Sequence, residues 1–395
     1  MRRVKDAMGL APTFPLLIVG GTNGKGSTCA YLEAILRAAG YKTGLYTSPH
    51  LLRYNERVRI TGREASDAEL VAAFEKIDAA RGNTSLTYFE FGTLGAMQQF
   101  IDAGVDVAIL EVGLGGRLDA VNVFDADAAI VTSVDLDHME YLGDSREQIG
   151  FEKAGIYRAD RPAICADPVP PASLLEHARR IGTDLRCVER DFSAQREDGQ
   201  WTYRGPDTTW PELPLPAMAG AFQLRNAAAA LAALEAVRTR LPVSVEAMRQ
   251  GLVAAQVAGR FQRIAHEPEV ILDVAHNPEA ARALAATLRE QPAAGRTLAV
   301  VGMLADKDAA GVFAALHDAV DAWWVCTPDS PRALDAATLA ATLRAHAGTA
   351  PISVQPDVNT ALAAARSAAH EDDRILVFGS FYTVAAVLDH AATQQ

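Results

Sequence analysis

The chain has 395 residues, which at about 150 residues per domain predicts two or three domains, each long enough to bury a core. Hydrophobic residues make up 49% of the chain and charged residues 22%, so a largely disordered protein is excluded. The formal net charge of −12 gives no basic footprint for a nucleic-acid backbone, and nucleic-acid binding is not expected.

The cysteines show neither CxxC nor CxxH spacing; they are Cys29, Cys165, Cys187 and Cys326. We interpret them as buried thiols of a reducing compartment, because a disulfide framework or a zinc site needs closer or patterned spacing. The apolar run 15–19 leads into a glycine-rich turn and predicts a strand, not a signal peptide. No run approaches the ~18 apolar residues that span a bilayer. A cytoplasmic protein without a membrane partner is expected.

Short apolar runs alternate with amphipathic helical stretches, which is typical of βα units and a mainly parallel sheet. In chain order, the pattern predicts a strand at 16–21, a helix at 27–40 that a glycine ends, and buried strands at 105–113 and 127–135. The segment 191–216 contains two Trp and four Pro and interrupts this rhythm. It predicts an irregular or antiparallel insertion.

A second βα series begins near residue 260, with predicted strands at 270–273, 297–302, 323–327, 352–354 and 375–379. The fold class expected is therefore α/β with two domains. Residues 1–258 would form a P-loop-type nucleotide-binding domain with a mainly parallel sheet, and residues 259–395 a smaller Rossmann-like α/β domain. A cleft between two such domains is the expected place for a site.

The strongest chemical signal is GGTNGKGST at 20–28, between a predicted strand and a predicted helix. Glycines let backbone N–H groups surround a phosphate, the helix N-terminus adds positive potential, and a lysine adds a mobile charge. The segment departs from GxxxxGK[ST], because three residues separate Gly20 from Gly24 and a glycine follows the lysine. A plain glycine-rich turn is the alternative. The pattern favours a triphosphate site made by Thr22, Asn23, Gly24, Lys25, Gly26 and Ser27.

Further motifs follow in one order along the chain: TSPHL (47–51), NERVRI (55–60), EVGLGGRLD (111–119), DLDH (135–138), EKAGI (152–156), LDVAHNP (272–278) and FGSF (378–381). With GTNGKGS, they resemble the dihydrofolate synthase/folylpolyglutamate synthase family, which is related to the Mur ligases. The resemblance covers about residues 2–390. LTYFEFGTL at 86–94 resembles the bifunctional bacterial type. In the family a further segment precedes the first strand, so we expect that segment to be shortened here.

Metal binding is expected at the end of the second buried strand, where Glu111 can face phosphates across a magnesium ion. A turn serine such as Ser48 is on its own more often a local cap, and a lone His138 is more often structural. Asp135 and Asp137 are alternative ligands. The resemblance implies two Mg²⁺ ions, with a monovalent cation as a further candidate, held by Ser48, Glu111, His138 and a carbamylated Lys153. Without the resemblance, Lys153 would be interpreted as a helix-surface charge.

A flat pterin requires an aromatic face and a hydrogen-bond acceptor. Tyr88 and Phe89 are the aromatic candidates, and the alternative for both is packing in the core. The resemblance assigns the pteroate to Thr87, Tyr88, Phe89, Glu90, Arg117, Leu118, Asp119 and Ala120. Asn226 opens a predicted helix, where an N-cap or first-turn role is the simplest interpretation.

The resemblance also implies roles for residues of the second half of the chain. Asn226 would contact adenine, Arg260 the γ-phosphate and Asp273 the ribose. Glutamate would be bound by His276, Asn277 and Ser380. The DKD segment 306–308 is either a loop contact or a solvated charge cluster. The catalytic residues implied are Lys25, Glu111, His138, Lys153 and Arg260.

The function implied is that of an ATP-dependent amide ligase. ATP, dihydropteroate and L-glutamate would give dihydrofolate through an acyl phosphate, and further glutamates would be added to reduced folates. The expected partners are these small molecules, and a monomer is expected. Three alternatives stay open: folylpolyglutamate synthesis alone, another Mur-type amino-acid ligation, and a nucleotide-binding regulator without catalysis.

Overall fold

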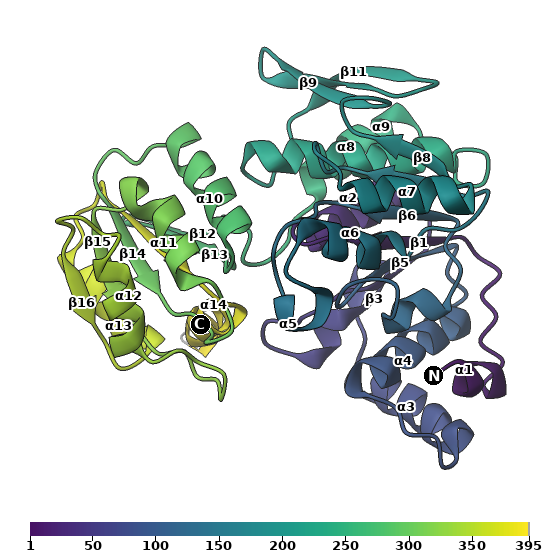
Figure 1. Ribbon diagram of the computed structural model, residues 1–395, viewed down its shortest axis with the longest axis horizontal. Helices are drawn as coiled ribbons and strands as arrows, with labels where there is room; N and C mark the ends of the chain where they lie inside the picture. Colours follow the sequence, from purple (N-terminus) through teal and green to yellow (C-terminus); the bar gives the residue numbers. More distant parts are fainter. Residues whose placement is uncertain (394–395) are drawn as a thin grey trace. The chain divides into compact units, whose positions relative to one another are not determined.

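The computed structural model describes residues 1–393, which form two compact units (Figure 1). The first unit contains Met1–Ala217 and Gln223–Gln256. The second contains Met218–Phe222 and the chain from Val257 onward. The α/β class predicted from the alternating pattern is confirmed in both units.

An eight-stranded sheet of order β4-β3-β2-β5-β1-β6-β7-β8 forms the centre of the first unit. The six strands from β2 to β8 in this order pair in parallel, and β3 and β4 add an antiparallel edge. Every residue of β1 is buried, as in a strand covered on both faces. The strands are β1 (Leu16–Gly20), β2 (Thr43–Tyr46), β3 (Val58–Ile60), β4 (Arg63–Glu64), β5 (Val107–Glu111), β6 (Ala128–Val131), β7 (Pro162–Cys165) and β8 (Asp184–Cys187).

Helices follow most of these strands, and several begin with a side-chain cap. Ser66 and Thr87 each form a capping box with the glutamate three residues later, which fixes the starts of α3 and α4. The helices are α1 (Arg2–Ala7), α2 (Lys25–Ala38), α3 (Asp67–Arg81), α4 (Tyr88–Ala103), α5 (Met139–Leu142), α6 (Arg146–Ala154), α7 (Ala172–Ile181), α8 (Ala221–Ala236) and α9 (Val245–Ala254), with short 3₁₀ turns at Tyr54–Arg57 and Ala120–Val123.

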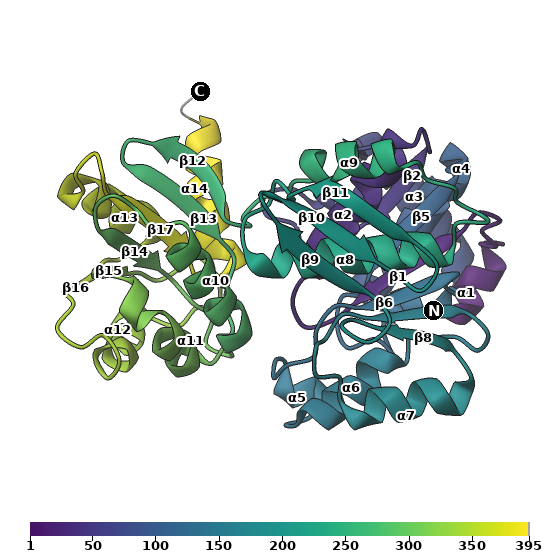
Figure 2. The same ribbon diagram turned by 90° about the horizontal axis from the view of Figure 1, so that it is seen from above.

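The interruption at 191–216 is a three-stranded antiparallel sheet, so the antiparallel form of that prediction is confirmed. Figure 2 shows it beside α8 and α9. Tyr203 is fully buried, and its hydroxyl donates to Glu235 Oε2 of α8 at 2.7 Å, which attaches the sheet to that helix. The strands are β9 (Ser193–Glu197), β10 (Gln200–Arg204) and β11 (Thr209–Pro214).

The second unit contains a six-stranded sheet of order β12-β13-β17-β14-β15-β16, parallel except for the edge strand β12. Each of the five strands predicted after residue 260 is found within a few residues of its expected place. The strands are β12 (Gln262–His266), β13 (Glu269–Asp273), β14 (Thr297–Val301), β15 (Ala322–Val325), β16 (Ile352–Val354) and β17 (Arg374–Phe378). The helices are α10 (Pro278–Glu290), α11 (Ala309–Leu316), α12 (Ala336–Arg344), α13 (Val358–Ala368) and α14 (Phe381–Thr393), with a 3₁₀ turn at His317–Ala319.

All four cysteines are buried thiols, as predicted. Within residues 1–393, none of the helices combines the length and apolar character that crossing a bilayer requires.

Candidate active site

The glycine-rich segment joins the end of β1 to the start of α2. Gly24 occupies the N-cap position of α2 with φ +87°, and a Cβ atom added there would lie 2.5 Å from Asn226 Oδ1. A Cβ atom at Gly21, with φ +143°, would lie 1.9 Å from Thr132 Oγ1. Only glycine fits at these two positions, because a side chain would meet both backbone strain and a neighbouring polar group.

The chain just after β6 supports the back of this loop. Thr22 N donates to Ser133 O at 2.8 Å, and Asn23 N donates to Ser133 Oγ at 3.1 Å. Thr132 Oγ1 donates to Asn23 O at 2.6 Å. The loop is therefore held open by protein contacts, which favours binding of an anion without rearrangement of the backbone.

Lys25 is the first residue of α2, and its ammonium turns back over the loop. Its Nζ donates to the carbonyl oxygens of Gly21 and Thr22, each at 3.0 Å. The first N–H groups of a helix have no partner within that helix and carry the positive end of its dipole. Together the helix start and the ammonium provide the positive potential that suits an anion.

Glu111 is the last residue of β5 and is 5% exposed. Its Oε2 accepts from Ser48 N at 3.0 Å, and its Oε1 lies 3.8 Å from the Cβ position of Gly26. The carboxylate therefore lies between the turn that contains Ser48 and the glycine-rich loop. The structure thus brings these two proposed metal ligands together beside the phosphate-binding segment.

His138 and Lys153 lie at the two ends of the segment that contains α5 and α6. His138 is the N-cap residue of α5 with φ +51°, and its Nε2 lies 3.9 Å from Asp137 Oδ2. Lys153 lies in the last turn of α6 and is only 3% exposed, so its interpretation as an ordinary surface charge is wrong.

The donor types present fit a magnesium ion that also binds substrate. Among residues 1–393, no group of three or more His, Cys, Asp and Glu side chains is arranged to hold a metal. Mg²⁺ in enzymes commonly takes one or two carboxylates and completes its shell with substrate phosphates and waters. Glu111 beside the phosphate loop fits that arrangement, and the described residues do not form a closed metal cage.

The two segments predicted to bind pteroate meet at Gly113. Phe89 Cζ lies 2.6 Å from the Cβ position of Gly113, so the ring rests on the loop after β5. The same ring lies 5.8 Å from that of Tyr46, at an interplanar angle of 34°. Tyr88 is 63% exposed, which excludes core packing for that residue. A half-buried aromatic face therefore lies beside the EVGLGGRLD loop.

Several of the predicted pteroate residues already have partners within the protein. Thr87 and Glu90 cap α4 by reciprocal hydrogen bonds, at 3.2 and 2.7 Å. Arg117 pairs with Glu152 of α6 at 2.9 Å and lies over the ring of Phe151. By contrast, Leu118 is 78% exposed, and Ala120 begins a 3₁₀ turn.

The Asp119 carboxylate organises the loop that contains it. Its Oδ2 accepts from Gly113 N at 3.0 Å and from Leu114 N at 2.9 Å, and its Oδ1 accepts from Val121 N at 3.0 Å. Burial raises the pKa of Asp119 to about 6, although the three N–H donors and the Lys25 charge act in the opposite direction. At most one strong acceptor position on Oδ1 is left for a ligand.

The structure corrects the predicted place of Asn226. Helix α8 begins at Ala221, so Asn226 lies inside the helix and cannot be an N-cap or first-turn residue. Its Oδ1 lies against Gly24, and its Nδ2 donates to Gln223 Oε1 at 3.2 Å. Gln223 Nε2 in turn donates to Ser27 Oγ at 3.2 Å. Gln223 was missed by sequence reasoning, although it lies three residues before Asn226 on the same helical face.

In the second unit, Asp273 ends β13 as predicted. Its carboxylate accepts from Phe261 N and Ala275 N, each at 2.8 Å. Burial raises the pKa of Asp273, and the nearby Arg260 charge opposes that shift. The Arg260 guanidinium lies 5.7 Å from the ring centroid of Phe381.

Asn277 and Ser380 begin two helices that follow paired parallel strands. Asn277 Oδ1 accepts from Ala280 N at 2.9 Å at the start of α10, and Ser380 Oγ accepts from Thr383 N at 3.1 Å in the first turn of α14. Because β13 and β17 pair in register, both helices start at the same edge of the sheet. The His276 ring lies near that of Phe381, with centroids 6.1 Å apart. Two helix N-termini at one edge favour an anionic ligand.

Two other groups make contacts that the sequence does not specify. In the DKD segment, Asp308 caps α11 through Gly311 N and Asp306 pairs with Arg332, so both acidic residues have structural partners. The motifs 47–51 and 55–60 contribute an unforeseen contact, in which Arg57 Nε donates to His50 Nδ1 at 2.8 Å. A contact between motifs cannot be predicted from either motif alone.

Comparison with known proteins shows which families the chain resembles. Residues 19–167 match the family described as "Mur ligase middle domain", and residues 259–381 match "Mur ligase, glutamate ligase domain". The dihydrofolate synthase/folylpolyglutamate synthase of Escherichia coli K12 is 47% identical over 382 residues, which is 96% of this chain and 87% of that protein.

Two solved structures are similar over the whole chain. E. coli FolC in complex with DHPP and ADP has a TM-score of 0.94 at 45% identity, covering 100% of this chain and 92% of that one. A bifunctional folylpolyglutamate synthase/dihydrofolate synthase with Mn, AMPPNP and L-glutamate bound has a TM-score of 0.92 at 46% identity, covering 100% and 93%.

A phosphate-binding sheet unit followed by a glutamate-ligase unit defines an ATP-dependent ligase of the Mur type. Within that class, the identity and coverage place the chain more narrowly. It belongs to the dihydrofolate synthase/folylpolyglutamate synthase family.

Proposed function

We propose that this protein joins L-glutamate to 7,8-dihydropteroate and adds further glutamates to reduced folates, in both cases with ATP. The observation that carries the proposal is the position of Glu111, whose carboxylate lies beside both Ser48 and the glycine-rich loop. A carboxylate at this point can hold a divalent cation, and that cation would neutralise charge where a nucleoside triphosphate meets an acceptor, which is the main requirement of phosphoryl transfer.

The ATP phosphates are proposed to bind at the start of α2, through the backbone of Thr22–Ser27 and the Lys25 ammonium. Lys25 Nζ bonds to two loop carbonyls at 3.0 Å and can exchange them for phosphate oxygens. The position of Asn226 against Gly24 supports its contact with the nucleotide. Arg260 and Asp273 are proposed to contact the γ-phosphate and the ribose.

Two Mg²⁺ ions are proposed to be held by Ser48, Glu111, His138 and Lys153 as its carbamate. When bound, these ions would neutralise the phosphate charge and polarise the transferring group. Carbamylation is proposed because an ammonium has no lone pair for a metal, whereas a carbamate has two anionic oxygens. Lys153 is 3% exposed, so its side chain lies inside the protein and not in solvent as an ordinary surface lysine would.

The pteroate is proposed to lie on the half-buried face made by Phe89 and the loop 113–119, with Tyr88 and the exposed Leu118 beside it. Its carboxylate oxygen attacks the γ-phosphorus, and ADP leaves. The amine of glutamate then attacks the acyl-phosphate carbonyl and releases inorganic phosphate. Glutamate is proposed to bind near His276, Asn277 and Ser380, at the sheet edge where α10 and α14 begin.

The test is product analysis by mass spectrometry. The purified protein is incubated with MgATP and L-glutamate, once with dihydropteroate and once with tetrahydrofolate. We expect both acceptors to gain one glutamyl residue, with sustained ADP formation over many turnovers only when all three substrates are present. Glutamylation of tetrahydrofolate alone would restrict the function to folylpolyglutamate synthesis, and no product from either acceptor would overturn the proposal.

The matched variants are Lys25→Ala and Lys76→Ala. Lys76 is a half-exposed surface lysine paired with Asp102 at 2.6 Å, so its removal should leave turnover unchanged. Lys25→Ala should abolish ADP formation and change the free energy of unfolding by no more than about 1 kcal/mol, because only two loop hydrogen bonds are lost. Normal turnover by Lys25→Ala would dismiss the phosphate-loop assignment.

A further inference from the structure

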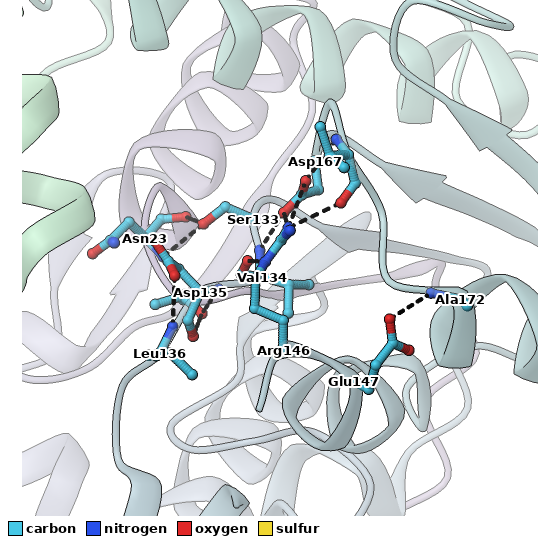
Figure 3. A network of polar contacts seen from close by, with 11 residues as sticks. Asn23, Ser133, Val134, Asp135, Leu136, Arg146, Glu147, Asp167 and Ala172 are labelled. Atoms are coloured by element: carbon cyan, nitrogen blue, oxygen red, sulfur yellow. Dashed lines mark hydrogen bonds and ion pairs between the residues drawn. The ribbon is translucent and has the colours of Figure 1, made fainter. Parts of the chain in front are cut away.

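A partly buried ion pair lies beside the segment 133–135, which contacts the phosphate loop and leads to His138. Arg146 is the first residue of α6, and Asp167 lies two residues after the end of β7. Arg146 Nη2 lies 3.1 Å from Asp167 Oδ2 and 3.2 Å from Oδ1 (Figure 3). The Asp167 side chain is 5% exposed, whereas that of Arg146 is 38% exposed.

This pair binds both polar groups of the Val134 backbone. Val134 N donates to Asp167 Oδ2 at 2.7 Å, and Arg146 Nε donates to Val134 O at 2.8 Å. Val134 is 1% exposed, so neither backbone group can easily exchange its partner for water. The guanidinium also reaches the turn after β7, because Arg146 Nη2 donates to Val169 O at 2.9 Å.

The residues on both sides of Val134 bind the phosphate loop. Ser133 O accepts from Thr22 N at 2.8 Å. Asp135 N donates to Thr22 Oγ1 at 3.0 Å, and that hydroxyl donates back to Asp135 O at 3.1 Å. Figure 3 shows the ion pair, Val134 and Asn23 of the phosphate loop in one network. The segment 133–135 is therefore attached to the loop on one side and to the ion pair on the other.

We propose that Arg146 and Asp167 are positioning residues of the ligase, which fix Val134 and so set the places of His138 and of α6 with Lys153. The proposal rests on the proposed function, since it takes His138 and Lys153 as metal ligands. The hydrogen bonds of the two side chains are made to each other and to the protein backbone. Their effect on His138 would pass along the chain, because His138 is four residues after Val134. Their effect on Lys153 would pass through α6, because Arg146 is the first residue of that helix.

The geometry requires an arginine and not merely a positive charge. A guanidinium presents Nε and Nη2 on one planar edge, and Arg146 uses them on Val134 O and on Asp167 together. A lysine can keep the ion pair but cannot make this set of directed bonds. Arg146→Lys therefore keeps a positive charge beside the buried Asp167 carboxylate but loses the hydrogen bond from Arg146 Nε to Val134 O.

The second unit provides a matched control. Arg296 pairs with Asp373 at 2.7 Å, with side-chain exposures of 46% and 3%, close to those of the Arg146–Asp167 pair. Asp373 likewise accepts backbone N–H groups, from Arg296 and His370. It lies next to the first residue of β17, at the opposite end of that strand from Ser380. Arg296→Lys should therefore carry a similar stability cost with no effect on metal binding.

The experiment titrates Mn²⁺ into the protein saturated with AMPPNP, and follows bound metal by electron paramagnetic resonance. The variants are Arg146→Lys, Asp167→Asn, Arg296→Lys and His138→Ala, each with its melting temperature measured. We expect Arg146→Lys and Asp167→Asn to weaken Mn²⁺ affinity about tenfold, the usual size for residues that orient metal ligands. Arg296→Lys should bind Mn²⁺ as the wild type does.

Arg146→Lys and Asp167→Asn are the two clamp variants. The proposal is overturned if either of them folds and binds Mn²⁺ with wild-type affinity. His138→Ala separates that failure from failure of the proposed function. If His138→Ala binds Mn²⁺ weakly while both clamp variants bind it normally, the metal assignment stands and the positioning role is wrong. If His138→Ala also binds it normally, His138 is not a ligand, and both assignments are wrong.

Discussion

Glu111 Oε2 accepts a hydrogen bond of 3.0 Å from the backbone N–H of Ser48, which joins the end of β5 to the turn after β2. The two strands are parallel neighbours, so both residues lie at the carboxyl edge of the same sheet. Because the contact uses the Ser48 backbone, it leaves the serine hydroxyl to a different partner. The structural role and the proposed metal role of Ser48 can therefore be separated by mutation.

Replacing Ser48 with alanine should keep the fold and weaken metal binding. The N–H bond to Glu111 survives, so the free energy of unfolding should change by less than about 0.5 kcal/mol. The Mg²⁺ concentration for half-maximal ADP formation should rise about tenfold or more, because a direct oxygen ligand is lost. Activity titrations against Mg²⁺ measure the effect.

Ser66→Ala is the control for the serine hydroxyl. Ser66 Oγ accepts from Glu69 N as the N-cap of α3, away from the glycine-rich loop in sequence. Its loss should cost about 1 kcal/mol of stability and leave the Mg²⁺ dependence unchanged. If Ser48→Ala showed this same pattern, its hydroxyl would be a cap and not a ligand.

A second prediction concerns Gly24, where strain and a steric contact coincide. Gly24→Ala and Gly40→Ala both place a Cβ atom on a left-handed backbone, with φ +87° and +90°. A Cβ atom at Gly40 meets nothing within 4 Å, whereas at Gly24 it meets the Asn226 amide at 2.5 Å. Both variants should lose about 1 kcal/mol from strain. Only Gly24→Ala should raise the KM for ATP, and we expect at least a tenfold change.

Equal KM values for the two glycine variants would show that the approach of Asn226 to the loop has no role in nucleotide binding. Urea unfolding measures the loss of stability that backbone strain causes in both variants. The KM for ATP measures the effect that we expect only at Gly24. The comparison depends on the match in φ, which leaves the Asn226 contact as the main difference between the two sites.

The strands were predictable because a parallel strand that is buried on both faces consists of a short run of mainly apolar residues. Leu16–Gly20 and Arg374–Phe378 are examples. The start of α8 was not, because no Ser, Thr, Asp or Asn stands directly before Ala221 to mark an N-cap. The consequence was an error at Asn226, which lies one turn deeper in its helix than predicted.

Side-chain partners were the least predictable feature of the site. Asp119 lies in the EVGLGGRLD segment, but nothing in that motif shows that three backbone N–H groups donate to its carboxylate. The Arg146–Asp167 contact joins residues 21 positions apart on different elements. Such pairs depend on how β7 and α6 pack, which hydrophobic periodicity does not encode.

The Asp119 carboxyl should make stability depend on pH. Its pKa is raised to about 6 from an ordinary value of 3.8, so the fold favours the protonated form. This contribution to stability is fully present below pH 3.8 and is lost as the pH rises through about 6. From pH 5 to pH 7 the wild type should lose about 1 kcal/mol relative to Asp119→Asn, whose amide does not titrate.

Urea unfolding at the two pH values measures this difference, with Asp329→Asn as the control at an exposed position. The control should run parallel to the wild type from pH 5 to pH 7. If the free energy of unfolding of Asp119→Asn changed with pH just as that of the wild type does, the pKa of Asp119 would not be raised. The three N–H donors would then keep the carboxylate charged from pH 5 to pH 7.

The last prediction concerns Lys153, whose side chain is buried in the last turn of α6. An ammonium cannot bind Mg²⁺, whereas the carbamate that a neutral amine forms with CO₂ offers two anionic oxygens. Addition of CO₂ to the amine forms an N–C bond and releases one proton, which leaves a carbamate. Protein incubated with ¹³C-bicarbonate at mildly alkaline pH should show a carbamate carbon signal in NMR spectra.

Lys153→Ala should lack that signal and lose ligase activity by at least a hundredfold, whereas the surface variant Lys76→Ala should keep both. Full activity in Lys153→Ala, or an unchanged carbamate signal in that variant, would show that Lys153 is a buried structural lysine and that the ligase works without a carbamate at this position.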